Sequence, residues 1–187
     1  AISLIQMDER MDHGPIIAQK KVNIPPDRMH NDMLFDMAQM SYYMLFDSVQ
    51  DISTSIANMT VQEEDKKTHT QLLSRQSGYI SNDLFTELLK DIKVANDKLP
   101  DIILTYLKKN PHVSFTAPTG MLFMWNLYRA LSPWPGIWTE VEINGVKKRL
   151  KIVEMAYNNG DPEIVSVQLE GKNPVSYKSF IDSYRIS

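Results

Sequence analysis

The 187 residues are enough for one large domain or two small ones, and 43% apolar residues, 23% charged residues and a net charge of −3 are typical of an ordinary folded chain. The absence of cysteine excludes a disulfide scaffold, a cysteine-based zinc site and thiol catalysis. Four scattered histidines favour no metal site. No apolar run approaches the roughly 20 residues of a membrane-spanning helix and no signal peptide is recognisable, so we expect a cytoplasmic protein with no membrane partner.

The N-terminal part of the sequence predicts two strands and a long helix. Residues 1–7 form an apolar segment that predicts a strand without a starting Met, which suggests a piece of a longer protein. An acidic turn separates it from a second predicted strand over residues 16–24, and Pro25–Asp27 then opens a helix that extends to residue 56. Apolar residues recur in this helix at steps of three and four, which predicts an amphipathic helix with a core-facing stripe. The stripe consists of Met33, Leu34, Met37, Met40, Met44, Leu45, Val49 and Ile52.

The middle of the chain predicts a linker followed by helices. Residues 57–80 are polar and turn-rich and are typical of a linker. Residues 82–109 predict two helices that are separated at Pro100. A further helix is expected from Pro118 to Leu131, where Pro133-Trp134-Pro135-Gly136 ends it.

The last part of the chain predicts β-structure. Asn144-Gly145 is a strong signal for a type I′ hairpin turn between two strands. A short closing helix is expected around residues 177–184. Short strands at close spacing are typical of a small barrel or an open antiparallel sheet. The strands are expected at residues 137–143, 146–154 and 163–169.

Several segments resemble folate-dependent formyltransferases. Residues 6–15, with the sequence QMDERMDHGP, resemble the MDxGxDxGP segment shared across that superfamily, and residues 25–38 resemble the stretch that follows it. Residues 129–139, RALSPWPGIWT, are similar to the RAFxPWPGxxT segment of the methionyl-tRNA formyltransferase branch. The strand around residues 148–152 and the turn at residues 171–174 fit the same branch.

The resemblance implies a C-terminal portion of such an enzyme. Residues 1–56 would be the last part of an α/β, Rossmann-like catalytic domain, residues 57–80 a linker, and residues 117–187 a helix with a small, OB-like β-barrel. Residues 81–116 lie outside the family pattern as an insert. The family's preceding segment would hold the asparagine and histidine of the catalytic trio and most of the folate pocket, so we expect no turnover by this chain alone.

The resemblance also assigns roles in the loop before the second strand. The intact enzyme would transfer a formyl group from 10-formyltetrahydrofolate to the amino group of initiator methionyl-tRNA. The aspartate of the trio matches Asp12, which would orient and charge the catalytic imidazole. Asp8, Met11 and Gly14 would line the folate pocket. His13 is not a replacement catalytic histidine, because neighbouring turn residues seldom face the same way. Taken without the resemblance, a purely structural turn residue is the favoured interpretation of Asp12, and a solvated turn carboxylate is an equal alternative for Asp8.

Strand alternation places several cations on one face of the strand after Gly145. We interpret this face as a phosphate-contacting stripe for the acceptor arm of tRNA. The alternative is a solvated strand face, which the seven basic and seven acidic residues of the segment 140–187 favour. Trp134 and Trp138 are expected to pack rather than to stack on bases. The candidate contacts are Lys147, Arg149, Lys151 and Lys172, with Lys178 and Arg185 as reinforcement.

Two other functions remain open at this point. The chain could belong to another folate-dependent enzyme, acting on an amino sugar nucleotide or hydrolysing formyl-folate, because the Asp12 loop is shared. It could instead be a non-catalytic RNA-binding module. A third possibility is a self-contained helical-plus-barrel protein in which residues 82–116 cover the core that the missing domain would normally bury. If the chain is instead truncated, the strands of residues 1–24 lack sheet neighbours, so we expect self-association through this region.

Overall fold

A computed structural model describes residues 1–184, and the chain divides into two compact units between Thr68 and His69. Each unit is described by itself. Both are built from helices and one antiparallel sheet, so the expected α/β character is present. The first unit contains β1 (Ile2–Ile5), β2 (Ile16–Lys20), α1 (His30–Gln50), α2 (Ile52–Ala57) and the short 3-10 turn η1 (Glu64–Lys66).

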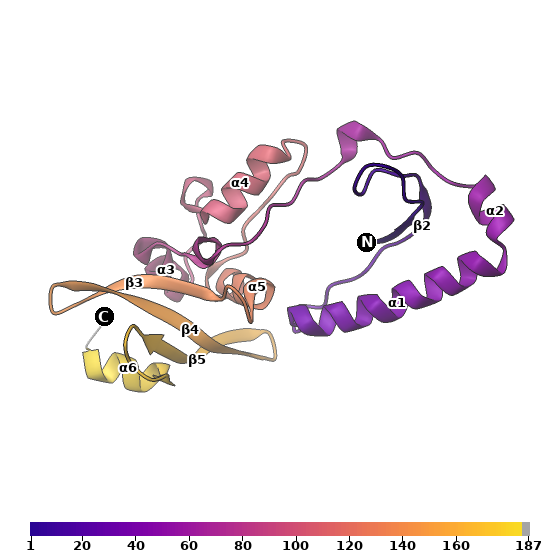
Figure 1. The fold of residues 1–187 in the computed structure, drawn as a ribbon. Helices are drawn as coiled ribbons and strands as arrows, with labels where there is room; N and C mark the ends of the chain where they lie inside the picture. Colours follow the sequence, from indigo (N-terminus) through magenta and orange to yellow (C-terminus); the bar gives the residue numbers. More distant parts are fainter. Residues whose placement is uncertain (185–187) are drawn as a thin grey trace. The chain divides into compact units, whose positions relative to one another are not determined.

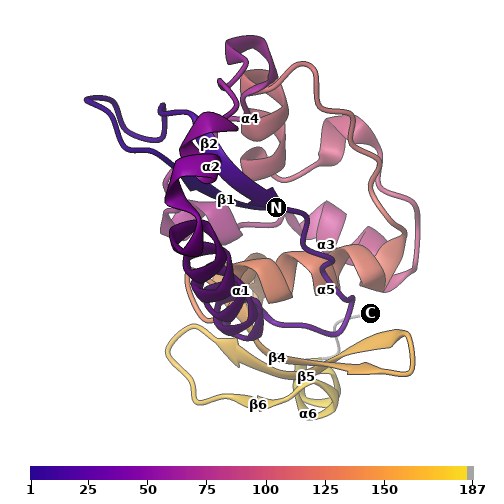
Figure 2. The ribbon, with the colours of Figure 1, turned by 90° about the vertical axis from the view of Figure 1, so that its right-hand side faces the viewer.

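The first unit is a hairpin beside a long helix. Strands β1 and β2 pair antiparallel, with Leu4 opposite Ala18, and Ile16 also exchanges backbone hydrogen bonds with Thr60. Helix α1 contacts both strands and α2 contacts β2 (Figure 2). The two strands predicted near the N-terminus are therefore confirmed, in shorter form than expected.

Helix α1 buries a narrower stripe than the sequence predicts. Met33 is buried and Met37, Met40 and Met44 are half-buried, all on the side of the helix that also carries the buried Ser48. The expectation is wrong for four members of the stripe, since a two-stranded hairpin covers only one narrow face of a helix. These four exposed residues are Leu34, Leu45, Val49 and Ile52.

The single helix expected over residues 30–56 is also wrong in detail. It ends at Gln50 and a second helix begins at Ile52. The Asp51 side chain accepts a hydrogen bond from the Thr54 backbone N–H at 3.1 Å, which is an N-cap for α2. An aspartate that can cap a new helix therefore interrupts an otherwise continuous apolar pattern.

The second unit contains most of the remaining structure. The helices and hairpin expected there are confirmed, including the break at Pro100, which precedes the first residue of α4, and the turn at Asn144 and Gly145, whose φ angles are 53° and 76°. Its elements are η2 (Arg75–Gly78), α3 (Asn82–Leu89), η3 (Asn96–Lys98), α4 (Asp101–Lys109), α5 (Gly120–Leu131), β3 (Ile137–Ile143), β4 (Val146–Asn158), β5 (Asp161–Leu169), β6 (Val175–Ser176) and α6 (Tyr177–Tyr184).

The sheet of the second unit is open rather than barrel-shaped. Its strand order is β3-β4-β5-β6, all antiparallel, and Figure 1 shows the long strands β3, β4 and β5 as one continuous sheet. The expectation of a closed, OB-like barrel is wrong for residues 1–184, because β6 has two residues and pairs with β5 but not with β3, so β3 and β6 are the two edge strands of an open sheet. A strand this short cannot supply the ladder that closure needs.

The hydrophobic core lies in the second unit. Leu88, Met124, Ile137, Leu150 and Val167 are fully buried, which joins α3 and α5 to the inner face of the sheet. The helical segment predicted as an insert therefore contributes to the same core as the strands. Among the described residues of the first unit, Met33 is the single buried hydrophobic side chain.

Candidate functional site

The loop between β1 and β2 is closed at its base by a glycine. Gly14 is buried, and a Cβ at this position would overlap the backbone carbonyl oxygen of Gln6. The Gln6 N–H donates to the Pro15 carbonyl at 2.9 Å, so the two ends of the loop are joined beside Gly14. A side chain here would force the strands apart, which explains the glycine without any contact to a ligand.

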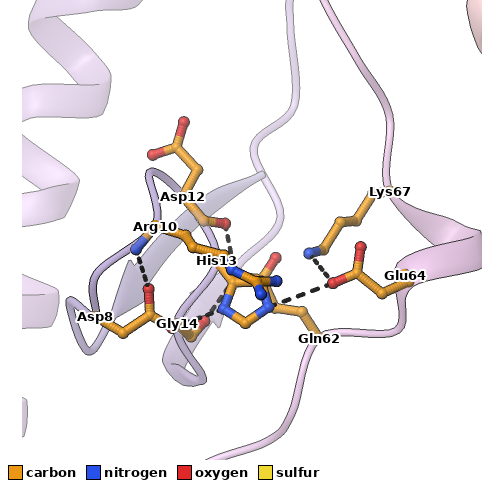
Figure 3. Close-up of polar contacts among 8 residues, drawn as sticks. All are labelled: Asp8, Arg10, Asp12, His13, Gly14, Gln62, Glu64 and Lys67. Carbon is orange, nitrogen blue, oxygen red and sulfur yellow. Dashed lines mark hydrogen bonds and ion pairs between the residues drawn. The ribbon is translucent and has the colours of Figure 1, made fainter.

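A residue from the expected linker holds the loop from outside. The Gln62 side-chain amide donates to the carbonyl oxygens of Asp12, at 3.0 Å, and Gly14, at 2.6 Å (Figure 3). These two carbonyl groups are therefore occupied by the protein itself. Sequence reasoning missed Gln62, because a glutamine in a polar stretch carries no signal of a partner 48 to 50 residues away.

Asp8 and His13 form the charged centre of the loop. The His13 Nδ1 atom lies 2.6 Å from Asp8 Oδ2, and its Nε2 atom lies 3.5 Å from Glu64 Oε1 (Figure 3). The hydrogen bond with His13, helped by the Arg10 backbone N–H at 2.9 Å, holds the pKa of the Asp8 carboxyl below its ordinary value. Thus His13 pairs with Asp8 rather than with its neighbour Asp12.

Asp12 and Met11 project from the same loop. Asp12 has a φ of 54°, in the left-handed region, and is exposed. Its carboxylate points away from the His13 ring in Figure 3 and has no hydrogen bond or ion pair with any residue in the range 1–184. Met11 is 92% exposed. The four loop candidates therefore divide into Asp8 and Gly14, which have structural partners, and Met11 and Asp12, which face outward.

The cations of β4 lie where strand alternation predicts. Lys147 and Arg149 are exposed and Lys151 is half-buried, while Leu150 and Ile152 between and beyond them are buried. Their cross-strand neighbours in β3 differ. The neighbours are Glu142 for Lys147, Glu140 for Arg149 and Trp138 for Lys151. Two of the three cations therefore face a carboxylate across the sheet, and Lys151 faces an aromatic ring.

Lys172 and Lys178 are exposed on the turn after β5 and on α6. The Lys172 carbonyl accepts a hydrogen bond from the Gln168 side chain at 3.0 Å, which orders the turn. Arg185, the third residue expected to reinforce the stripe, lies outside the described residues.

A cleft of about 420 Å³ opens on the sheet beside this stripe. Trp138 lies in its wall, half-buried against Tyr79 with ring centroids 4.7 Å apart, as expected for a packing residue. Trp134 is 56% exposed, so the expectation that it packs is wrong. Charged and aromatic residues dominate the lining. Arg75 is among them, although its place in a polar, turn-rich stretch of the sequence gives no signal of such a site. These residues are Arg75, Trp134, Trp138, Arg149, Lys151 and Glu170.

Two kinds of feature are absent from the described part of the chain. Among residues 1–184, no group of three histidine, aspartate or glutamate side chains could hold a metal ion. Across the same residues, no helix combines the length and the apolar character required to span a bilayer.

Comparison with known proteins identifies distant relatives. The chain is 22% identical over 174 residues to a protein of Sorangium cellulosum named methionyl-tRNA formyltransferase. The aligned region covers 93% of this chain and 45% of the relative. A Dictyoglomus turgidum protein of the same name is 22% identical and covers 100% of this chain and 55% of the relative. One from Roseiflexus castenholzii is 29% identical over 79 residues, or 42% of this chain. No protein-family profile matches the chain.

The similarity confirms the resemblance inferred from the sequence. It extends along most of the chain, whereas the chain spans only about half the length of the two longer-matching relatives. This proportion is consistent with a C-terminal portion of a methionyl-tRNA formyltransferase. The relatives are formyltransferases by name.

Proposed function

We propose that the chain is the C-terminal portion of a methionyl-tRNA formyltransferase that transfers a formyl group from 10-formyltetrahydrofolate to initiator methionyl-tRNA in the cytoplasm. The observation that carries this proposal is similarity along nearly the whole chain to proteins of that name. Residues 1–56 would then be the end of the Rossmann-like catalytic domain, and the sheet of the second unit would replace the expected barrel as the tRNA-binding part.

The free carboxylate of Asp12 supports its assignment to the catalytic machinery. Formyl transfer builds negative charge on a tetrahedral intermediate and requires protons to move. A carboxylate without an internal partner is available to accept an imidazole N–H and to stabilise the positive charge on that ring. The carboxylate of Asp8 is not available for this role, because His13 already occupies one of its oxygens at 2.6 Å.

The same loop is compatible with a folate contact. Gly14 keeps the loop closed at its base, Gln62 fixes two of its carbonyl groups, and Met11 is left exposed at its tip. This arrangement offers an apolar side chain and a free carboxylate on a braced loop. Asp8 and Gly14 would shape the loop, and Met11 would contact the donor.

The cationic face of β4 supports a tRNA partner. Lys147, Arg149 and Lys151 lie along one side of a strand, at a spacing suited to a phosphate backbone, and Lys172 is exposed on the turn after β5. Glu142 and Glu140 are the cross-strand neighbours of Lys147 and Arg149, and they reduce the positive electrostatic potential of this face. We therefore expect moderate rather than tight tRNA binding by the chain alone.

The proposal is tested by comparing tRNA ligands. The purified chain should bind initiator methionyl-tRNA and should bind elongator methionyl-tRNA more weakly, without forming N-formylmethionine from 10-formyltetrahydrofolate. Equal binding of both tRNAs would favour a non-catalytic RNA-binding module. Binding of neither, with retained affinity for a sugar nucleotide, would favour the amino-sugar branch. Formylation by these 187 residues would contradict the expected dependence on a preceding catalytic segment.

A further inference from the structure

The cleft beside the cationic stripe brings together three cations and two indole rings. Arg75 comes from η2, Lys151 and Arg149 from β4, and the tryptophans from the turn before β3 and from β3 itself. Within the described range, none of the three cations forms an ion pair with a carboxylate. The Arg149 guanidinium lies 5.8 Å from the centre of the Trp138 ring instead. The charges are therefore available to an anion from outside.

The fold builds this cleft from segments that are distant in sequence. The Trp138 indole N–H donates to the Arg75 carbonyl at 3.0 Å, and the Ile80 N–H donates to the Trp138 carbonyl at 2.9 Å. Gly78 allows this approach, because a Cβ there would overlap the carbonyl oxygen of Gly136. The segment at residues 75–80 is thus fixed along the edge of β3, with Arg75 at the rim of the cleft.

The tryptophans have different surroundings. The Trp138 indole N–H donates to the Arg75 carbonyl, and its ring contacts the Tyr79 ring with the centroids 4.7 Å apart. Trp134 is 56% exposed and has no ring contact with any residue of the described part of the chain. Its indole is therefore free to receive a planar group, and the cations lie beside it in the same cleft.

The chemistry of the lining selects a nucleotide. Bases stack on exposed aromatic rings regardless of sequence, and arginine and lysine hold the phosphate that follows. Glu170, which accepts the Arg149 backbone N–H at 3.1 Å, adds an acceptor for an amino or hydroxyl group and disfavours a highly charged ligand. The volume of about 420 Å³ is in the range of small-ligand sites.

We propose that this cleft binds one unpaired nucleotide of an RNA strand, with its base against Trp134 and its phosphate between Arg75, Arg149 and Lys151. The inference rests on the proposed function only in assigning the strand to tRNA. It goes beyond the phosphate stripe, because it adds a base-stacking residue and a cation from the segment before α3.

The test uses the full chain and a fluorescein-labelled single-stranded RNA tetranucleotide, followed by fluorescence anisotropy. Trp134→Leu should weaken binding about fivefold or more, since base stacking on an aromatic ring is worth roughly 1–3 kcal/mol. Arg75→Gln should also weaken binding about fivefold or more, because it removes one of the three cations around the phosphate. Trp134→Phe should retain most of the affinity. Lys109→Gln is the matched control, because it removes an exposed cation of α4 that lines neither the cleft nor the cationic stripe, and it should change binding less than Arg75→Gln.

Competitors identify the source of the ligand. Adenosine 5′-monophosphate should displace the tetranucleotide, and adenosine or inorganic phosphate alone should do so much less well. An unchanged affinity of Trp134→Leu, or equal competition by inorganic phosphate, would overturn the proposal. Preferred binding of a free mononucleotide over the tetranucleotide would overturn its assignment to an RNA strand. Tetranucleotide binding at the cleft without binding of initiator tRNA would refute the proposed function and leave this inference standing.

Discussion

Individual residues show how closely backbone segments approach in this chain. Gly78 packs against the Gly136 carbonyl, so Gly78→Ala must push η2 away from the turn before β3. Overpacking of this kind costs about 1–3 kcal/mol, and we expect that loss in the free energy of unfolding. Tryptophan fluorescence in urea measures it, since all three tryptophans lie in the second unit. Gln76→Ala in the same turn is the control, and an equal effect of both substitutions would contradict the steric explanation.

The pKa of the Asp8 carboxyl group tests the contact between Asp8 and His13. His13 is the first cause of the lowered pKa, so His13→Ala should move the pKa of the Asp8 carboxyl upward, and the Arg10 N–H should prevent a complete return. Because the pKa is depressed in the folded loop, the contact stabilises the loop above the ordinary value of about 4 and is lost as the pH falls through the lower value. Carboxyl-carbon NMR measures the titration, and an unchanged Asp8 curve in the variant would refute the pairing.

The secondary-structure elements agree with the predictions from the sequence where neighbouring residues determine them. The Asn144-Gly145 turn, the break at Pro100 and the alternation of β4 were predictable, because turn geometry, the missing proline N–H and the period of a strand depend on neighbouring residues. The choice between a closed barrel and an open sheet was not predictable, since closure depends on a strand of two residues at the far end of the sheet. The partners Gln62 and Arg75 were not predictable either, because their contacts are with residues far away in sequence.

The strand β4 offers a direct comparison of buried and exposed positions. Leu150 is 0% exposed and Val146 is 56% exposed, although both are apolar residues of the same strand. Leu150→Ala should lower the free energy of unfolding by about 2–5 kcal/mol, because it leaves a cavity in the core. Val146→Ala should change it by less than about 0.5 kcal/mol. Chemical denaturation of both variants measures the difference, and similar losses would contradict the location of the core.

The two units differ in how much apolar surface they bury. In the first unit, the side of α1 opposite the methionines presents Phe35, Tyr42, Phe46 and Val49, which are 51–70% exposed. Tyr42 and Phe46 stack at 6.4 Å. We name these four residues the aromatic face of α1. An exposed apolar face of this kind favours association, so we expect copies of the chain to associate through it.

Sedimentation velocity tests this association. The average mass should rise with concentration, and Phe35→Ser combined with Phe46→Ser should reduce the rise. Leu72→Ser is the control, because Leu72 is 97% exposed but belongs to the second unit. A wild-type chain that stays monomeric at high concentration would contradict the expectation, as would association that persists unchanged in the double variant.

The most direct test of the central proposal is the affinity of the chain for initiator methionyl-tRNA as a function of salt concentration. Each phosphate neutralised by the β4 stripe releases counterions, so binding should weaken steeply with salt. Lys147→Gln combined with Lys172→Gln should lower the slope as well as the affinity. We predict a steep slope for the wild-type chain and a shallower one for this variant. No binding at low salt, or the same slope for both proteins, would mean that the cationic face is only a solvated strand surface.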